Sequence, residues 1–216
     1  MNLKTNNMEN VMQIHPAHPD IHRDDTASKL GMWLFIFSEL LLFGGLFIVY
    51  SVYRYMNPVA FDLAHRELSI AMGFVNTIIL LISSATVAMS ITAIQKNDKK
   101  ASLIFLTSTI LLAIIFLINK YFEWSSKFEH GMYPGSDLMD MLSNGDMLFF
   151  SLYFFMTGLH AVHILIGLGL LSTSLIKIKR NDIRSDKYSL LENSGLYWHL
   201  VDLIWIFLFP LFYLIH

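Results

Sequence analysis

The chain has 216 residues, of which 55% are hydrophobic and only 15% are charged, and its mean hydropathy is +0.52. Soluble domains carry about a quarter charged residues, so this balance indicates a membrane protein, and a net charge of -2 gives no reason to expect a nucleic-acid partner. With no cysteine, the chain can form no disulfide, thiolate metal site, iron–sulfur cluster or c-type haem attachment.

Residues 1–29 are polar and are expected to form a tail ahead of a membrane domain covering residues 30–216. They contain no apolar core followed by a small-residue cleavage site, so they are not interpreted as a secretory signal. The tail carries His15, His18 and His22. Imidazoles bind divalent metals, but the intervening prolines and the lack of helical spacing favour a solvated tail over a metal site.

Five apolar segments follow the tail, each close to or above the 20 or so residues that a helix needs to cross roughly 30 Å of hydrocarbon. They cover residues 30–53, 71–94, 101–122, 147–176 and 195–216, and the fourth is long enough to tilt or to project from the bilayer. Shorter polar connections cover residues 56–69, 95–100, 123–146 and 177–193. The sequence therefore predicts an all-α polytopic membrane protein, a bundle of five transmembrane helices.

The distribution of basic residues predicts the orientation of this bundle. Eleven lysines and arginines lie in the tail and in the second and fourth connections, whereas four lie on the opposite side. Because loops rich in these residues remain cytoplasmic, the N-terminus is expected inside and the C-terminus outside. The outside connection 123–146 is acidic, which would suit a basic partner, but an ordinary solvated surface is favoured.

In the first span, the stretch FIFSELLLFGG places one acid, Glu39, in an otherwise apolar run. Glu39 lies about nine residues into the span, which at about 1.5 Å per residue is near the bilayer middle. An acidic side chain there costs about 2.5–3.5 kcal/mol, so it should face protein or water and not lipid. Two interpretations remain open: part of a proton path, or a neutral acid that is hydrogen-bonded between helices.

The fourth and fifth spans also carry polar residues at helical spacing. His160 and His163 are three residues apart, as are His199 and Asp202, so each pair should share a helix face and point into the bundle. There the two helices could exchange hydrogen bonds. His160 or His163 together with His199 would in principle ligate a haem, but a local His199–Asp202 pair gives a simpler structural explanation.

Four segments carry a family resemblance: GMWLFIFSELLLFGGLF, NTIILLISS, YFFMTGLHAVHILIG and YWHLVDLIWIFLFPLFY. In this order they resemble the signature segments of subunit III of haem–copper terminal oxidases. The resemblance implies an accessory subunit in a bacterial cytoplasmic membrane, bound to subunits I and II. The haems and copper would lie in those partners, which reduce dioxygen to water with electrons from cytochrome c or quinol and pump protons.

The resemblance also implies roles for individual residues. Glu39 matches the buried, reactive glutamate of the family, which implies support of proton uptake and sustained turnover. Members of the family hold phospholipid in a cleft, and the matching bundle positions here are Trp33, Ser38, His160, His163, Trp198, His199 and Asp202. The larger members have seven helices, and the five spans predicted here are expected to correspond to all but the first two. Because the cleft lies between that pair and the other five, a complete cleft is not expected within this chain.

The expected function is therefore assembly, lipid retention and proton uptake in a cytochrome c oxidase. No catalytic residue, metal ligand or cofactor is assigned to the chain itself, and phospholipids or a respiratory supercomplex are further candidate partners. A subunit of a quinol oxidase or nitric oxide reductase is the alternative within the family. A proton-coupled transporter or a haem b membrane anchor is the alternative outside it, although paired, interrupted helices typical of transporters are not evident.

Overall fold

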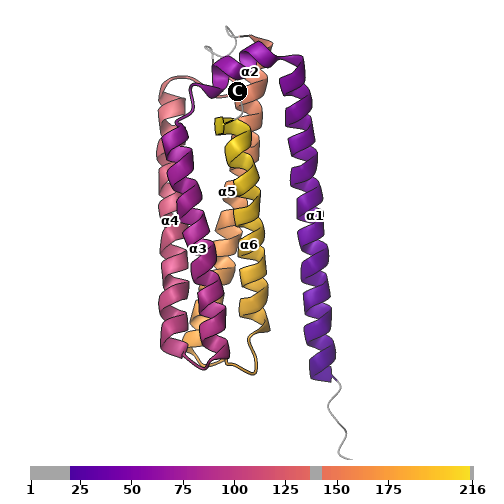
Figure 1. Ribbon diagram of the computed structural model, residues 1–216, viewed down its shortest axis with the longest axis vertical. Helices are drawn as coiled ribbons and strands as arrows, with labels where there is room; N and C mark the ends of the chain where they lie inside the picture. The colour runs from indigo at the N-terminus through magenta and orange to yellow at the C-terminus, as the bar shows by residue number, and fades with distance from the viewer. Residues whose placement is uncertain (1–19, 137–142, 215–216) are drawn as a thin grey trace, which may run out of the picture.

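The computed structural model describes residues 20–136 and 143–214, and the described residues are mostly helical (Figure 1). The elements are α1 (Asp20–Met56), α2 (Pro58–His65), α3 (Ile70–Gln95), α4 (Lys99–Glu129), α5 (Asn144–Lys179), α6 (Ser189–Phe209) and the π-helical turn η2 (Pro210–Leu214). Five of these helices are long and apolar enough to cross a membrane. The predicted all-α fold with five membrane spans is thus confirmed.

Short polar side chains mark where the membrane helices begin and end. The side chains of Ser69, Asp98 and Ser143 each accept a hydrogen bond from a backbone N–H in the first turn of α3, α4 and α5. Such N-caps satisfy donors that have no partner within the helix. After α3 and α5, Asn97 and Asn181 adopt left-handed backbone angles, with φ of 60° and 64°. Asparagine tolerates this conformation, which allows two abrupt helix ends at the same end of the bundle.

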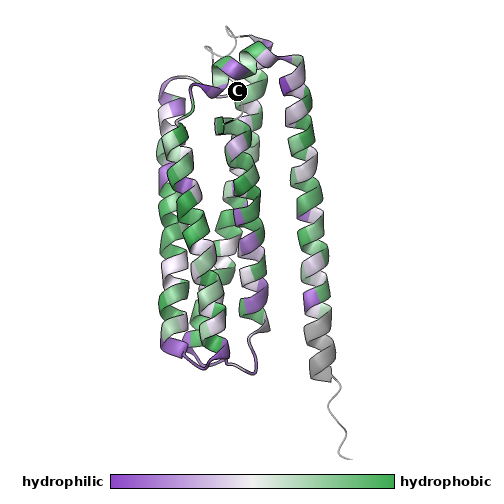
Figure 2. Cartoon of the chain, in the orientation of Figure 1, coloured by the Kyte–Doolittle hydropathy of each residue, from purple (hydrophilic) through white to green (hydrophobic). Residues whose placement is uncertain are grey.

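Helices α3 to α6 form a bundle, and α1 stands beside it (Figure 1). Helix α1 contacts mainly α5 and α6, and only 6% of the most apolar 18-residue stretch of Ala27–Met56 is buried, against 61% for that of Ser189–Leu214. Hydropathy colouring shows apolar residues along the shafts and polar residues gathered at the helix ends (Figure 2). We refer to the end that carries α2 and η2 as the α2 end, and to the end with the α3–α4 and α5–α6 connections as the basic end.

Helix α1 meets the bundle along one narrow stripe. Its positions are alternately four and three residues apart and are all buried or half-buried: Met32, Ile36, Glu39, Phe43, Leu46 and Tyr50. This is the spacing of a two-helix contact seam, since it keeps one face of a helix toward its neighbour. Glu39 is the only acid of the seam, and it lies near the middle of the span Ala27–Met56.

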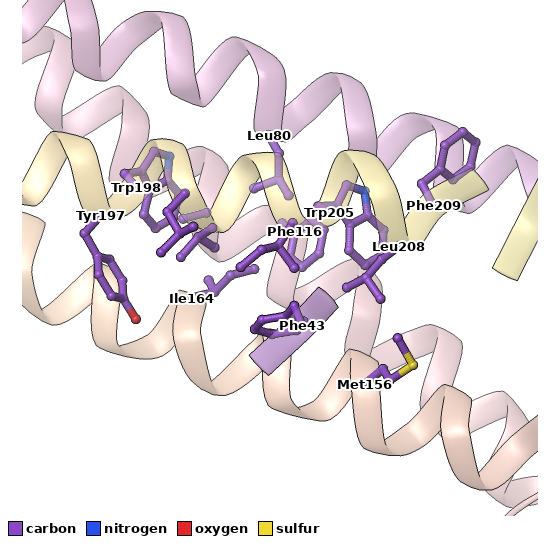
Figure 3. Close-up of a cluster of buried hydrophobic side chains, with 14 of the residues drawn as sticks. Phe43, Leu80, Phe116, Met156, Ile164, Tyr197, Trp198, Trp205, Leu208 and Phe209 are labelled. Carbon is purple, nitrogen blue, oxygen red and sulfur yellow. The ribbon is translucent and has the colours of Figure 1, made fainter. Parts of the chain in front are cut away.

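The core of the bundle is aromatic and centres on α6 (Figure 3). Trp198 and Trp205 are fully buried, and the indole N–H of Trp198 donates to Ser83 Oγ at 3.0 Å. Trp198 packs directly over Gly167 of α5, where an added Cβ would lie 2.8 Å from the indole ring. Trp205 meets Phe116 of α4 edge to face at 4.9 Å. Close-packed rings and satisfied indole groups therefore fix α6 against its neighbours.

Several predicted boundaries need correction. Helix α1 begins at Asp20, within the expected tail, whose His15 and His18 lie outside the described residues. Helix α4 continues to Glu129, so Glu123 belongs to a membrane helix and not to a solvated acidic connection. The predicted span ended at residue 122 because Glu123 is charged. In the structure, however, Lys120 and Glu123 are buried in the bundle, while Tyr121 points outward and is 68% exposed. Helix α2 was also missed, because it is only eight residues long.

Candidate functional site

The acid in the first span has a partner on another helix. Oε2 of Glu39 lies 3.0 Å from Nε2 of His163 on α5, and the two side chains are 15% and 9% exposed. The other ring nitrogen of His163, Nδ1, lies 2.8 Å from the carbonyl oxygen of Leu159, one turn earlier in α5. The acid is therefore held by an imidazole whose orientation is fixed by its own helix.

This arrangement defines where the protons lie. The Leu159 carbonyl oxygen can only accept, so Nδ1 of His163 must carry a proton, and the hydrogen-bond network assigns this tautomer. A second proton then lies between Nε2 and Oε2, either on the imidazole or on the carboxyl group. In both cases the pair has no net charge. It can hold one shared proton between α1 and α5 without leaving an isolated ion in the membrane.

Aromatic residues enclose the Glu39–His163 pair. Phe43, one turn after Glu39, meets the imidazole edge to face at 5.4 Å. The hydroxyl of Tyr197 on α6 donates to the backbone oxygen of His163 at 3.1 Å, and its ring stacks on Phe35 of α1 at 5.8 Å. These contacts tie three helices together around the pair.

A mostly apolar cavity of about 270 Å³ lies between α1, α5 and α6, on the basic-end side of the pair. Its lining residues are Met32, Phe35, Ile166, Leu170, Leu190, Asn193, Ser194 and Tyr197. Beyond the cavity, α1 is tied to the start of α6, because Lys29 Nζ lies 3.1 Å from Glu192 and the Asn193 amide donates to Ser28 at 2.8 Å. These two polar contacts between α1 and α6 therefore lie at the basic-end side of the cavity.

His199 and Asp202 lie together on α6, but no direct hydrogen bond joins them in the described structure. Nδ1 of His199 lies 2.7 Å from Oγ of Ser84 on α3, and Ser84 also lies beside the Asp202 carboxyl group. Oδ1 of Asp202 is buried without a hydrogen-bond partner among the described residues. The expected local His199–Asp202 pair is thus replaced by a contact with α3, because their shared face points toward α3 and not toward α5.

His160 occupies a different environment from His163. It is fully buried, its ring stacks on Trp205 with centroids 5.2 Å apart, and Phe116 meets it edge to face at 5.9 Å. Neither ring nitrogen has a hydrogen-bond partner among the described residues. An axial haem ligand needs a free imidazole nitrogen, and His163 has none, since both of its nitrogens are engaged.

Trp33 and Ser38 lie outside the bundle interior. Trp33 is 60% exposed, and the exposed Ser38 hydroxyl donates to the Phe35 carbonyl of its own helix at 2.7 Å. Both positions fall off the contact stripe of α1. Among the described residues, neither side chain makes a hydrogen bond or ring contact to another helix, whereas Glu39, His163, Trp198 and His199 contact neighbouring helices.

A second polar cluster lies at the α2 end and was missed from the sequence. The ammonium of Lys120 on α4 donates to Glu123 at 3.0 Å, to Tyr153 of α5 at 3.0 Å and to Tyr213 of η2 at 2.8 Å. Both tyrosine hydroxyls donate in turn to Oε1 of Glu123, at 2.8 and 2.5 Å. The side chains of Lys120 and Glu123 are only 3% and 4% exposed.

A helical signal for this cluster was present in the sequence. Phe116, Lys120, Glu123 and Lys127 recur at intervals of four, three and four residues, which places them on one face of a continuous helix. The opposite face carries Tyr121 and Phe122. Assigning that apolar face to lipid would have placed the charged face inside the bundle.

Comparisons with known proteins agree with this architecture. The family model of cytochrome c oxidase subunit III matches residues 17–216. Cytochrome c oxidase subunit 3 of Synechocystis sp. is 31% identical over 93% of this chain and 78% of its own length. A probable quinol oxidase subunit 3 of Staphylococcus saprophyticus is 29% identical over 87% of this chain and 89% of its own length.

A third relative is a longer protein. The heme-copper oxidase subunit I+III of Aeropyrum pernix is 30% identical over 87% of this chain, which spans only 22% of that relative. These similarities agree with the family match along most of the sequence and with the five membrane helices. The chain belongs to the cytochrome c oxidase subunit III family, the family of subunit III of haem–copper oxidases.

Proposed function

We propose that the chain is a non-catalytic accessory subunit of a cytochrome c oxidase in a bacterial cytoplasmic membrane, with its N-terminus inside. It would bind subunits I and II, which would carry the haems and copper and reduce dioxygen to water. The observation that carries this proposal is the Glu39–His163 pair, which holds one shared proton near the middle of a membrane span. Ionisable pairs at this depth are typical of proton-handling sites.

The chain's own residues would store and orient this proton. His163 fixes the carboxyl group of Glu39, and Leu159 fixes the imidazole. Because the pair has no net charge in either protonation arrangement, a proton could exchange between Oε2 and Nε2 without changing the net charge held at this depth. The pair would supply protons to, or buffer them for, the catalytic subunit against which this chain is bound.

We further propose that lipid retention involves the apolar cavity between α1, α5 and α6. Met32, Ile166 and Leu170 offer an acyl chain an apolar wall, and Asn193 and Ser194 offer polar groups toward the basic end. A volume of about 270 Å³ can hold part of one acyl chain but not a whole phospholipid. The rest of the lipid would lie against a neighbouring subunit.

A quinol oxidase is the second candidate, because the Staphylococcus saprophyticus relative carries that name. A nitric oxide reductase subunit has no comparable support. A transporter is disfavoured by the five spans of the described residues, which are continuous helices and not the broken ones that line transport sites. A haem b anchor is disfavoured because both nitrogens of His163 are engaged, and the fully buried ring of His160 is packed against Trp205 and Phe116.

The experiment that tests the role of the pair is Glu39→Ala in the purified complex. The haem spectrum should stay intact, while proton uptake or sustained turnover should decline modestly. Ser51→Ala is the matched control, since this exposed hydroxyl of the same helix donates to the Phe47 carbonyl of its own helix. Loss of the haem centre in an otherwise assembled complex would contradict the separation of roles, and unchanged proton uptake and turnover would remove Glu39 from proton handling.

A further inference from the structure

The π-helical turn η2 contacts three membrane helices, α1, α4 and α5. The carbonyl oxygen of Leu211 accepts a hydrogen bond from the Tyr50 hydroxyl of α1 at 2.8 Å. Phe212 meets the rings of Tyr50 at 4.9 Å and of Tyr153 on α5 at 5.5 Å. Tyr213 reaches Lys120 and Glu123 on α4. Three consecutive residues of η2 thus contact α1, α5 and α4.

The Lys120–Glu123 cluster leaves no polar hydrogen unused. Lysine offers three hydrogens and the two tyrosine hydroxyls offer one each, and all five are used in hydrogen bonds among these four side chains, where the two hydroxyl oxygens also lie 3.4 Å apart. Lys120 also lies over the rings of Tyr153 and Trp205, at 4.8 and 5.2 Å from their centroids. A closed set of this kind holds its members in one geometry, because any displacement leaves a buried charge without a partner.

We propose that Lys120 and Glu123 are positioning residues for α1. They fix Tyr213, Tyr213 fixes η2, and η2 presents the Leu211 carbonyl to Tyr50. Apolar contact with the bundle gives α1 little preference over contact with lipid chains, so its few polar contacts decide where it sits. Tyr50 makes a polar contact at the α2 end, and Glu39 makes one in the middle.

The consequence is a coupling between two sites with no direct contact. When the cluster is intact, the Tyr50 contact holds the α1 seam in register, and Glu39 stays within reach of His163. When Tyr213 loses its partners, η2 is released, and the α2 end of α1 moves away from the bundle. The inference concerns the position of α1 and does not depend on the proposed role in an oxidase.

Thiol cross-linking in the native complex tests this inference. The chain has no cysteine, so the combined substitution Phe47→Cys and Phe207→Cys introduces a single pair of thiols. In the native protein the rings of Phe47 on α1 and Phe207 on α6 have their centroids 6.1 Å apart. A short bifunctional thiol reagent measures their proximity, and mass spectrometry identifies the linked chain. The variants are Tyr213→Phe, Tyr50→Phe and the double variant Lys120→Met with Glu123→Leu. Tyr55→Phe is the matched control, because Tyr55 is 88% exposed.

Tyr213→Phe and Tyr50→Phe should each lower the cross-linking yield by about threefold or more relative to Tyr55→Phe, as expected when a hydrogen bond of ordinary strength holds the contact. The double variant should fold, since apolar residues can replace a buried ion pair, and yet show the same loss of yield. A control-level yield in Tyr213→Phe would overturn the proposal. Should the double variant fail to assemble, Tyr213→Phe decides alone, because it keeps the ring and removes only the hydroxyl.

Discussion

Glu39 of α1 and His163 of α5 are separated by 124 positions in the sequence and by 3.0 Å between Oε2 and Nε2. The contact explains how a carboxyl group is accommodated in the middle of an apolar span. It also makes His163, and not Glu39 alone, part of the site. The pair forms the central polar contact between α1 and the bundle, so its removal should affect stability as well as proton handling.

Glu39 and His163 should show strong energetic coupling. His163→Leu alone leaves a half-buried acid without its partner and should lower the free energy of unfolding by about 1–3 kcal/mol. Glu39→Leu combined with His163→Leu should recover part of that loss, giving a coupling energy of about 0.5–3 kcal/mol in a double-mutant cycle. Thermal denaturation of the purified complex in one detergent measures all four proteins. Strictly additive effects would show that the contact contributes nothing.

Lys120→Met should be among the most damaging single substitutions in the chain. It leaves the Glu123 carboxylate buried without its cation, which should cost about 3–5 kcal/mol. Adding Glu123→Leu should restore much of the loss. Lys100→Met, on the exposed start of the same helix, serves as the control. A melting temperature for Lys120→Met equal to that of the control would mean that the buried ion pair is unimportant for stability.

Gly167→Ala and Gly169→Ala should differ sharply although they lie two residues apart on α5. At Gly167 the new Cβ would meet the rigid Trp198 ring at 2.8 Å, so overpacking should cost about 1–3 kcal/mol. At Gly169 nothing lies within 4 Å, and alanine should be neutral or slightly stabilising. Comparison of the two melting temperatures checks the packing of α6 on α5, and equal values would contradict it.

Ser84→Ala should destabilise the contact between α3 and α6. It removes the partner of His199 Nδ1 and the hydroxyl beside Asp202, so one or two polar groups lose their hydrogen bond at a cost of about 1–3 kcal/mol. His199→Ala should give a similar loss and reduced assembly or lipid content. Ser108→Ala is a suitable control, because that half-buried hydroxyl donates to the Ile104 carbonyl of its own helix. An unaffected Ser84→Ala protein, by melting temperature and bound lipid, would argue against the contact.

The membrane fold could be predicted because it depends on local composition. Runs of apolar residues longer than the hydrocarbon thickness identify the five spans without knowledge of their packing. The inward placement of Glu39, His160 and Asp202 followed from the cost of polar groups in lipid. Those two arguments hold for any arrangement of the helices.

The partners of these residues could not be predicted from one sequence. Spacing of three residues shows that His199 and Asp202 share a face, but not that the face meets Ser84 of α3. The identity of the helix opposite a given face depends on the packing order of the bundle. Lys120 and Glu123 were missed for a related reason: charged residues near a span end look like a connection until the packing shows which way they point.

The most direct test of the account is purification of this chain from its native membrane in mild detergent, with subunit mass spectrometry and a reduced-minus-oxidised spectrum. We expect a large haem-bearing subunit I and a subunit II to be recovered with it, and the presence or absence of copper-binding cysteines in subunit II should distinguish cytochrome c from quinol as the donor. Recovery of the chain alone, with or without a haem of its own, would contradict the assignment as an oxidase subunit.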